Sequence, residues 1–239
     1  MFKKKKQIDV FTSVIIAAAG SGKRMGADVN KIFLPLSGVP VLAHTLSVFQ
    51  NMSEINEIIL VAAESEIMEV KNLAEDFGIT KVKTVVAGGK ERMDSVKNGL
   101  LEVSENADIV LVHDAARPLI KPETVSEIIE NIKIHGAAAC GAKNKNTVKR
   151  IDDNGFICET LDREYLVDIQ TPQGFKKDII LSAYAYAEKE KFSATDDCMV
   201  AEFAGVKVKV VFSTSDNLKI TTYDDLAVAE QILQRRGIN

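Results

Sequence analysis

Short apolar segments alternate with amphipathic ones along the first half of the chain, and this alternation limits the possible folds more than any other sequence feature. The apolar segments lack helical periodicity, which predicts strands over 14–19, 57–62, 83–87 and 109–113. The amphipathic segments predict helices over 41–49, 66–77, 91–103 and 122–134. Strands and helices that alternate at this spacing form right-handed βαβ units. The sequence therefore predicts an α/β fold with a mostly parallel sheet. A chain of 239 residues allows one large domain or one domain plus an appendage, and we expect a single domain over residues 1–239.

The second half contains a predicted hairpin, with β-rich segments over 147–151 and 156–160 around an Asn-Gly turn. A hairpin this polar is not stable alone, so we expect it to lie against another surface, such as a second subunit. The alternative is a solvated edge ribbon whose charges prevent aggregation. A turn is expected over 170–175. The other predicted elements are helices over 177–188 and 223–234, a helix capped by Thr195 or Asp196, and strands over 206–212 and 217–220.

The first predicted strand ends in a glycine-rich turn, Gly20-Ser21-Gly22, which is followed by the cations Lys23, Arg24 and Lys31. Small residues let backbone N–H groups come close to a ligand, and a strand's carboxyl end with three positive charges suits a polyphosphate. The alternative is an ordinary strand-to-helix turn with solvated cations. We expect Ala18, Ala19, Gly20 and Gly22 to bind substrate here.

Two familiar phosphate-binding motifs are excluded at this turn. A dinucleotide-binding fingerprint needs a third glycine where Met25 stands. A P-loop needs a hydroxyl residue in place of Arg24 and a glycine in place of Ala17. A dehydrogenase is disfavoured further, because residues 64–69 offer no clear ribose-binding acid.

A second polar turn, His113-Asp114-Ala115-Ala116-Arg117-Pro118, follows the predicted strand over 109–113. Open α/β sheets bind ligands at the carboxyl ends of their strands, so the acidic and basic side chains of this turn lie where a ligand is expected. Asp114 is suited to hold Mg²⁺, which takes one or two carboxylates together with substrate phosphates. The alternative is a structural ion pair between Asp114 and Arg117. His44, in the helix predicted over 41–49, is interpreted as a packed or surface residue.

Composition excludes several classes of protein. The formal net charge is −4, so no general positive field attracts nucleic acid. The basic run over 3–6 predicts a frayed terminus rather than a membrane tether, and no segment is apolar enough to be a signal peptide or a membrane span. Three widely spaced cysteines fit reduced thiols. We therefore expect a cytoplasmic protein without nucleic-acid or membrane partners.

Seven segments, in order and across nearly the whole chain, resemble one enzyme family. They are AAAGSGKRMG, FLPLSGVPVL after Lys31, GGKERMDSV, HDAARP, TVKR, TLDR before QTPQGF, and DNLKITTYDDLAVAE. The family is that of the cytidylyltransferases that couple 2-C-methyl-D-erythritol 4-phosphate to CTP in isoprenoid-precursor synthesis. The resemblance implies a Rossmann-like nucleotidyltransferase core, a protruding β-arm at about 140–165 used in dimerisation, a homodimer, and dependence on Mg²⁺.

The resemblance also implies roles for individual residues. Arg24 and Lys31 match the residues that stabilise the transition state, and Arg163 and Lys219 match those that position the sugar phosphate. Thr147 and Arg163 lie in the arm that serves the neighbouring subunit's site in this family.

Further positions match the family's HDAARP and GGKERMDSV segments. Asp114 and Arg117 match residues near the metal and substrate, and Gly89 and Ser95 match positions around the cytosine. The chain departs from the family at Asn30, where proline is usual, at Ile32, where glutamine or alanine is common, and at Lys90, where an acidic or small residue is frequent.

The reaction implied by the resemblance needs no general base. The second pKa of a phosphate monoester is about 6, so the attacking oxygen is already anionic at neutral pH. Catalysis then depends on in-line positioning and on neutralising phosphoryl charge. Two alternatives are a ribitol-5-phosphate cytidylyltransferase and a non-catalytic nucleotide-binding subunit. The opening AAAGSGKRM, the Ala115-Ala116 pair and the spacing of Arg163 before QTPQ favour the methylerythritol phosphate enzyme.

Overall fold

The structure, a computed structural model, describes residues 10–20 and 30–238. In these residues a seven-stranded sheet has the order β11-β7-β10-β6-β1-β4-β5. Its pairs are parallel except those of β10, which runs antiparallel to both β6 and β7. The strands are β1 (Thr12–Ala17), β4 (Glu57–Ala62), β5 (Val82–Ala87), β6 (Ile109–Asp114), β7 (Ala137–Lys143), β10 (Val167–Lys176) and β11 (Lys209–Phe212). The prediction of an α/β fold with a mostly parallel sheet is therefore confirmed.

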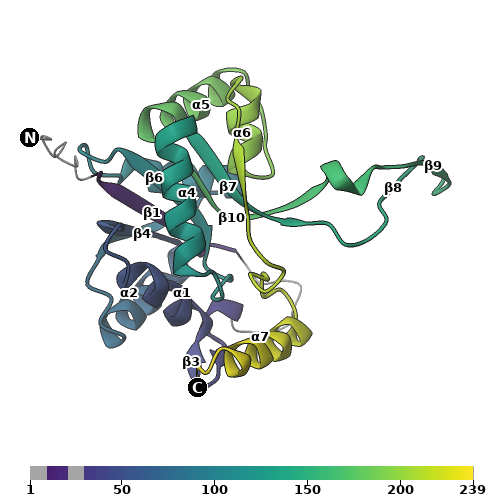
Figure 1. Ribbon diagram of the computed structural model, residues 1–239. Coiled ribbons are helices and arrows are strands. Elements are labelled where there is room, and N and C mark those ends of the chain that lie inside the picture. The colour runs from purple at the N-terminus through teal and green to yellow at the C-terminus, as the bar shows by residue number, and fades with distance from the viewer. Residues whose placement is uncertain (1–9, 21–29, 239) are drawn as a thin grey trace, which may run out of the picture.

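Helices cover both faces of the sheet (Figure 1). On one face lie α1 (Val41–Gln50), α2 (Ile67–Asp76) and α4 (Pro122–His135), and on the other α3 (Arg92–Leu101), α5 (Lys177–Lys189) and α6 (Asp197–Phe203). Successive strand side chains point to opposite faces, so Val14 and Ile16 of β1 join the first core and Ile15 joins the second. This burial on both faces explains why the strands read as continuous apolar runs.

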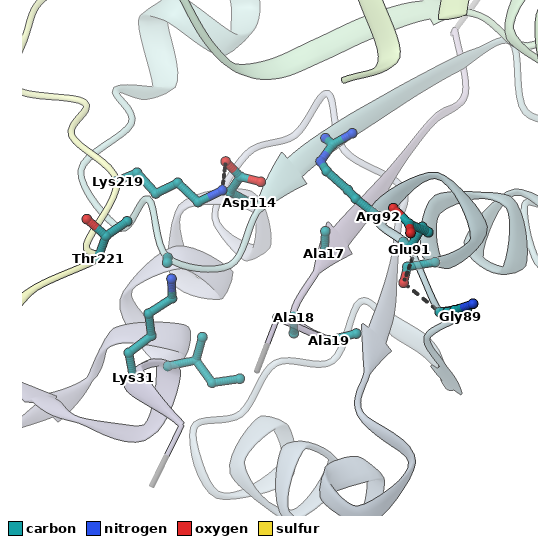
Figure 2. A pocket seen from close by; sticks show the side chains of 15 residues that line it. Ala17, Ala18, Ala19, Lys31, Gly89, Glu91, Arg92, Asp114, Lys219 and Thr221 are labelled. Atoms are coloured by element: carbon teal, nitrogen blue, oxygen red, sulfur yellow. Dashed lines mark hydrogen bonds and ion pairs between the residues drawn. The ribbon is translucent and has the colours of Figure 1, made fainter. Parts of the chain in front are cut away.

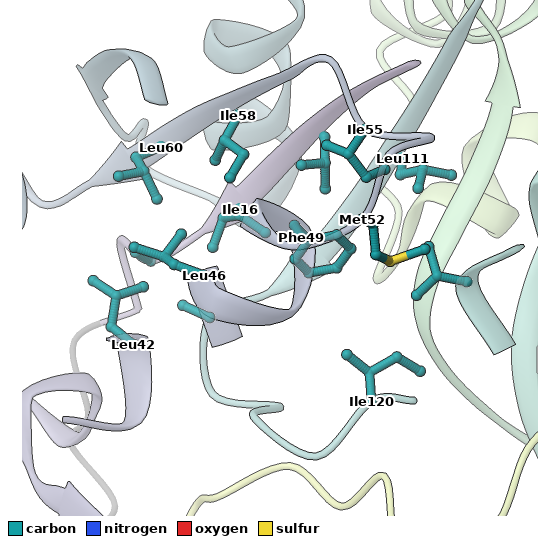
Figure 3. Close-up of a cluster of buried hydrophobic side chains, with 14 of the residues drawn as sticks. Ile16, Leu42, Leu46, Phe49, Met52, Ile55, Ile58, Leu60, Leu111 and Ile120 are labelled. Atoms are coloured by element: carbon teal, nitrogen blue, oxygen red, sulfur yellow. The ribbon is translucent and has the colours of Figure 1, made fainter. Parts of the chain in front are cut away.

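The first core is organised around α1. Leu42, Leu46 and Phe49 recur at helical spacing, and they are fully buried. Figure 3 shows them facing the strand residues Ile16 and Leu60. A smaller third core attaches the closing helix α7 (Tyr223–Arg235) to the connections beside the strand ends, and its members are Leu36, Val41, Leu119, Ile220, Ala229, Ile232 and Leu233.

Several predicted boundaries differ from the structure. Residues 217–220 are not a strand but an irregular segment, so that prediction was wrong. The turn expected over 170–175 lies inside β10, and the strand expected over 206–212 begins only at Lys209. The sheet register shifts between Ile169 and Gln173, and Pro172, which has no N–H to donate, lies within that shift.

The hairpin predicted over 147–160 forms a separate two-stranded sheet of β8 (Lys149–Ile151) and β9 (Ile157–Thr160). The Asp152 carboxylate closes its turn by accepting from the N–H groups of Asn154 and Phe156, and Gly155 adopts φ 83°. Figure 1 shows the hairpin at the end of long extensions from β7 and β10, away from the central sheet. Its large apolar side chains are exposed.

Shorter elements complete the described chain. They are η2 (Lys31–Phe33), β2 (Pro35–Leu36), β3 (Val39–Pro40), η3 (Glu64–Glu66) and η4 (Arg163–Tyr165). In the part of the chain that the structure describes, none of the helices combines the length and the apolar character needed to cross a membrane.

Candidate functional site

A cavity of about 580 Å³ opens at the carboxyl ends of β1, β5 and β6 (Figure 2). These strands are parallel, so their carboxyl ends meet at the same edge of the sheet. Most of the predicted site residues that the structure describes line this cavity; they are Ala18, Ala19, Gly20, Lys31, Gly89, Ser95, Asp114 and Lys219. Gly22 and Arg24 lie outside the described residues.

Backbone hydrogen bonds join the two polar turns. The Ala18 N–H donates to the Val61 carbonyl at 2.7 Å, which extends the β1–β4 pairing past the end of β1. The Ala115 N–H donates to the Ala17 carbonyl at 3.1 Å on the other side. The start of the glycine turn and the turn after β6 are therefore neighbours in the cavity wall, although about a hundred residues separate them in the sequence.

The turn after β5 forms a third wall and requires its two glycines. A Cβ at Gly88 would overlap Ala19, and a Cβ at Gly89 would overlap Asp94. The Gly89 N–H donates to Ser95 Oγ at 3.0 Å, and that hydroxyl donates to the Glu91 carbonyl at 3.0 Å. These contacts place the start of α3 against the cavity.

Asp114 lies at the centre of a group of cations. Its Oδ2 accepts from Lys219 Nζ at 3.0 Å and from Arg117 Nε at 3.2 Å, and its side chain is 10% exposed. Burial would raise the pKa of Asp114, but the charges of Lys219 and Arg117 outweigh it and lower the pKa to about 2. The carboxylate is therefore ionised at neutral pH. The structural ion pair considered as an alternative for Asp114 and Arg117 exists, and Lys219 joins it in the cavity.

The irregular segment 217–220 brings Lys219 to this point. The Ile220 N–H donates to the Ala116 carbonyl at 2.8 Å, and Arg117 Nη1 donates to the Asn217 carbonyl at 2.7 Å. The Asn217 side chain is buried and donates to Gln170 Oε1 and to the Thr171 carbonyl, both at 3.0 Å. A backbone hydrogen bond and several side-chain hydrogen bonds therefore hold this segment, in place of the inter-strand hydrogen bonds that the expected strand would have formed.

His113 lies behind the cavity wall and is fully buried. Its Nε2 is 3.1 Å from the Arg117 carbonyl, which can only accept, so Nε2 carries the proton and Nδ1 accepts from the Thr171 hydroxyl at 3.0 Å. Thr171 Oγ1 in turn accepts from the Asp114 N–H at 3.0 Å. Burial lowers the pKa of His113 to about 4. His113 therefore fixes the turn after β6 and does not face the cavity.

Lys31 lies in the short helix η2, which Asn30 begins. The Asn30 carboxamide accepts from the Ile32 N–H at 3.4 Å and donates to Glu66 Oε2 at 2.9 Å. Ile32 is buried in the first core. Two departures from the family pattern thus have local explanations, because Asn30 caps the turn that carries Lys31 and Ile32 packs beneath it. Lys90, the third departure, is an exposed residue of the cavity rim.

Sequence reasoning missed Arg92 and Thr221, which also line the cavity. Arg92 Nη2 donates to Asp197 Oδ2 at 2.7 Å, and Asp197 is fully buried. The feature of the sequence that could have identified Arg92 is its position at the start of the helix that follows the Gly88-Gly89 turn. Its partner is more than a hundred residues away, and no local pattern shows that contact.

Thr147 and Arg163 do not line the cavity of their own chain. Both are exposed on the extension that carries the hairpin. Arg163 Nη1 donates to the Lys145 carbonyl at 3.3 Å, within that same extension. Arg117 stands beside the cavity through its ion pair with Asp114.

The residues present fit a Mg²⁺ ion that arrives with a phosphorylated substrate. Both ion pairs of Asp114 use Oδ2, so Oδ1 is the oxygen that a metal would take. Across residues 10–20 and 30–238, no cluster of three or more His, Cys, Asp or Glu side chains is arranged to hold a metal. Mg²⁺ commonly binds through one or two carboxylates and takes its other ligands from phosphates and water.

Comparisons with known proteins identify the family of this chain. The family model described as 2-C-methyl-D-erythritol 4-phosphate cytidylyltransferase matches residues 12–235. The chain is 46% identical over 226 residues to the protein of that name from Alkaliphilus oremlandii (strain OhILAs), covering 94% of this chain and 96% of the relative. It is 46% identical over 225 residues to the protein of the same name from Clostridium acetobutylicum, covering 94% and 98%.

Solved structures show the same similarity. The 4-diphosphocytidyl-2C-methyl-D-erythritol synthase of Anaerococcus prevotii DSM 20548 has a TM-score of 0.84 at 35% identity, over 95% of this chain and 97% of that one. The 2-C-methyl-D-erythritol 4-phosphate cytidylyltransferase of Thermus thermophilus has a TM-score of 0.74 at 28% identity, over 94% and 100%.

Proposed function

Because this chain belongs to the family of 2-C-methyl-D-erythritol 4-phosphate cytidylyltransferases, we propose that it joins that alcohol phosphate to CTP in isoprenoid-precursor synthesis. The products are 4-diphosphocytidyl-2-C-methyl-D-erythritol and pyrophosphate. The observation that carries the proposal is the convergence of Lys31, Lys219 and Arg92 on one cavity at the strand ends, around an ionised Asp114. A cavity of this charge suits two phosphorylated substrates.

The reaction is a displacement at the α-phosphorus of CTP. An oxygen of the phosphate monoester forms a new bond to that phosphorus, and the bond to the bridging oxygen of the β-phosphate breaks. The electron pair of the broken bond leaves with pyrophosphate. The nucleophile is already anionic, so no side chain has to remove a proton. The burial of His113 is consistent with a mechanism that lacks a general base.

Positive charge supplies the catalysis in this proposal. Lys31 and Arg24 stabilise the negative charge on the reacting phosphoryl group, and Lys219 positions the sugar phosphate. The carboxylate of Asp114 and the neighbouring Arg117 orient Lys219 and the turn after β6. Ala18, Ala19 and Gly20 would bind the nucleotide through their backbone, and Gly89 and Ser95 would bind around the base. Gly22 stays a predicted substrate-binding residue outside the described part of the chain.

Mg²⁺ is the proposed cofactor, held by Asp114 and by the substrate phosphates. When bound, it neutralises charge on the triphosphate and helps to align it.

The active unit is proposed to be a homodimer. Thr147 and Arg163 are exposed and do not line the cavity of their own chain. The hairpin on the same extension exposes Ile151, Phe156 and Ile157. Apolar side chains on a protruding ribbon suit a protein surface. The guanidinium of Arg163, with its planar fork, would then grip the monoester phosphate in the partner's cavity.

A cytoplasmic location is also proposed. Cys140, Cys158 and Cys198 are all free thiols, as is usual in a reducing compartment.

Pyrophosphate release tests the proposed activity directly. The protein is mixed with CTP and Mg²⁺, and with 2-C-methyl-D-erythritol 4-phosphate, ribitol 5-phosphate or no acceptor. We expect release at a kcat/KM at least tenfold higher with the methylerythritol phosphate. Faster release with ribitol 5-phosphate would identify the alternative transferase, and no release with either acceptor would indicate a nucleotide-binding subunit.

A further inference from the structure

Arg92 is a cation of the cavity wall to which the reaction described above assigns no contact with either substrate. It is the first residue of α3, and its side chain is 26% exposed. Figure 2 shows the side chain extending from the start of α3 toward the end of β6 that carries Asp114. The charge of Arg92 contributes to the lowered pKa of Asp114, so its guanidinium acts electrostatically on the end of the cavity where Asp114 lies.

The guanidinium is fixed from behind by Asp197. Asp197 Oδ2 accepts from Arg92 Nη2 at 2.7 Å, and Oδ1 accepts from the Tyr184 hydroxyl at 2.6 Å. The N–H groups of Asp197 and Cys198 donate to Gln173 Oε1 at 2.9 and 3.0 Å. The carboxylate is therefore held between α5, α6 and β10 and has little freedom to move.

Only one guanidinium nitrogen takes part in this contact. Among the residues that the structure describes, the hydrogen bond of Arg92 uses Nη2, which leaves the donors on Nη1 and Nε for a ligand. Burial would lower the pKa of Arg92, but the charge of Asp197 outweighs it and raises the pKa. The side chain thus remains a permanently charged fork, of the kind that binds phosphoryl oxygens in pairs.

A purely structural role for this ion pair is a weaker explanation. The cost of removing two charges from water offsets most of the attraction in a buried pair, so such a pair adds little net stability. Apolar contacts already attach α3 and α6 to the same core. An arginine that lines a cavity and is held by a fully buried acid is better explained as a pre-positioned binding group.

We propose that Arg92 binds a phosphoryl group of the substrates at the Asp114 end of the cavity, and that Asp197 is the positioning residue that fixes its guanidinium. The inference rests on the proposed function, because it takes the two phosphorylated substrates as the ligands. The phosphoryl group belongs either to CTP or to the alcohol phosphate, and the experiment distinguishes these two sources.

The test is Asp197→Asn, which keeps the size of the side chain and an oxygen for Tyr184 but removes the charge. Misplacement of a binding group by about 1 Å can cost about 10²-fold in rate, so we expect kcat/KM to fall 10- to 100-fold. KM is measured separately for each substrate. A higher KM for CTP assigns the phosphoryl group to the nucleotide, and a higher KM for the alcohol phosphate assigns it to the acceptor.

A second variant covers the case in which Asp197→Asn fails to fold. Arg92→Lys keeps the charge opposite Asp197, so this variant should fold. It loses the planar fork, so its affinity for the phosphorylated substrate should be at least fivefold lower than that of the wild type. Cytidine, which has no phosphate, should bind both variants as it binds the wild type.

The matched control is Glu57→Gln. Glu57 is a buried carboxylate outside the cavity lining; Oε1 accepts from Ser13 Oγ at 2.5 Å, and Lys83 lies 3.8 Å from Oε2. This change should lower stability and leave both KM values unaltered.

Calorimetric titration with CTP, and with the alcohol phosphate in the presence of CTP, measures affinity without turnover. It therefore tests Arg92 and Asp197 even if the wild type transfers no cytidylyl group. Absence of transfer by the wild type would overturn the proposed function but not the inference about Arg92. Unchanged affinities and unchanged kcat in both Arg92→Lys and a folded Asp197→Asn would overturn the inference.

Discussion

At the scale of single residues, the site is a small group of cations around Asp114, and neighbouring side chains set the positions of these residues. Asn30 caps the turn of Lys31, and Thr171 and His113 fix the turn of Asp114. The family resemblance identified Lys31 and Lys219 from the sequence, whereas Arg92 was missed. Their supporting contacts were not visible in the sequence, because they join residues far apart in the chain.

Lys31 is the described residue whose removal should affect catalysis most. Lys31→Ala deletes a pre-organised charge from the cavity, and removal of one such group typically costs about 10²–10³ in kcat. We expect a loss of that size with little change in the free energy of unfolding. Lys71→Ala, on the exposed side of α2, is the matched control and should retain full activity. Turnover within a few-fold of the wild type in Lys31→Ala would remove Lys31 from the mechanism.

His113 should make stability depend on pH. Burial holds its pKa near 4, below the ordinary value of 6.5, so the unfolded chain binds a proton in this interval that the folded chain does not. The stability from neutral His113 is thus complete above about pH 6.5 and is lost as the pH falls toward 4. Between pH 7 and pH 5 the free energy of unfolding should drop by about 2 kcal/mol.

Urea unfolding of the metal-free protein at both pH values measures this drop. His113→Gln has no titratable group at this position, so its stability at pH 7 should be lower and its loss between pH 7 and pH 5 smaller by that amount. Equal pH dependence in the wild type and in His113→Gln would show that His113 is not the responsible group.

At the scale of elements, the sequence predicted the helices and the parallel strands well because their apolar patterns are long. β4 was predicted at its exact bounds, and α1 to α5 within a few residues. β7 was not predicted, because its Ala-rich segment has low β propensity, and β10 was hidden by Pro172 and Gly174. Strand pairing in the sheet overrides these local preferences.

The hairpin is the element whose role is easiest to test. Phe156 and Ile157 are 71% and 65% exposed, so replacing both with glutamate costs the folded monomer little. If they contact a second copy, the double variant should shift from dimer to monomer in sedimentation analysis and lose at least tenfold in activity. Leu101→Glu on α3, at a position 74% exposed, is the matched control and should stay dimeric. A fully active monomeric wild type would contradict the proposed role.

At the scale of the whole molecule, a net charge of −4 coexists with a cavity that attracts anions. The positive charge is local, because Lys31, Lys90, Arg92 and Lys219 all line one opening. Phosphorylated ligands are therefore attracted to this place rather than to the general surface. The acids of the chain lie mostly elsewhere, and in the cavity lining that the structure describes only Glu91 accompanies Asp114.

This distribution of charge predicts how the protein responds to metal and nucleotide together. One carboxylate, shared with two cations, is a poor site for free Mg²⁺, whereas the phosphates of CTP supply further oxygen ligands. In thermal unfolding, Mg²⁺ alone should leave the Tm unchanged. CTP with Mg²⁺ at a hundred times the Kd should stabilise the protein by about 2.7 kcal/mol, a shift of about 5–10 °C. EDTA should reduce that shift and abolish pyrophosphate release. A large shift with Mg²⁺ alone would instead indicate a metal site built by the protein itself.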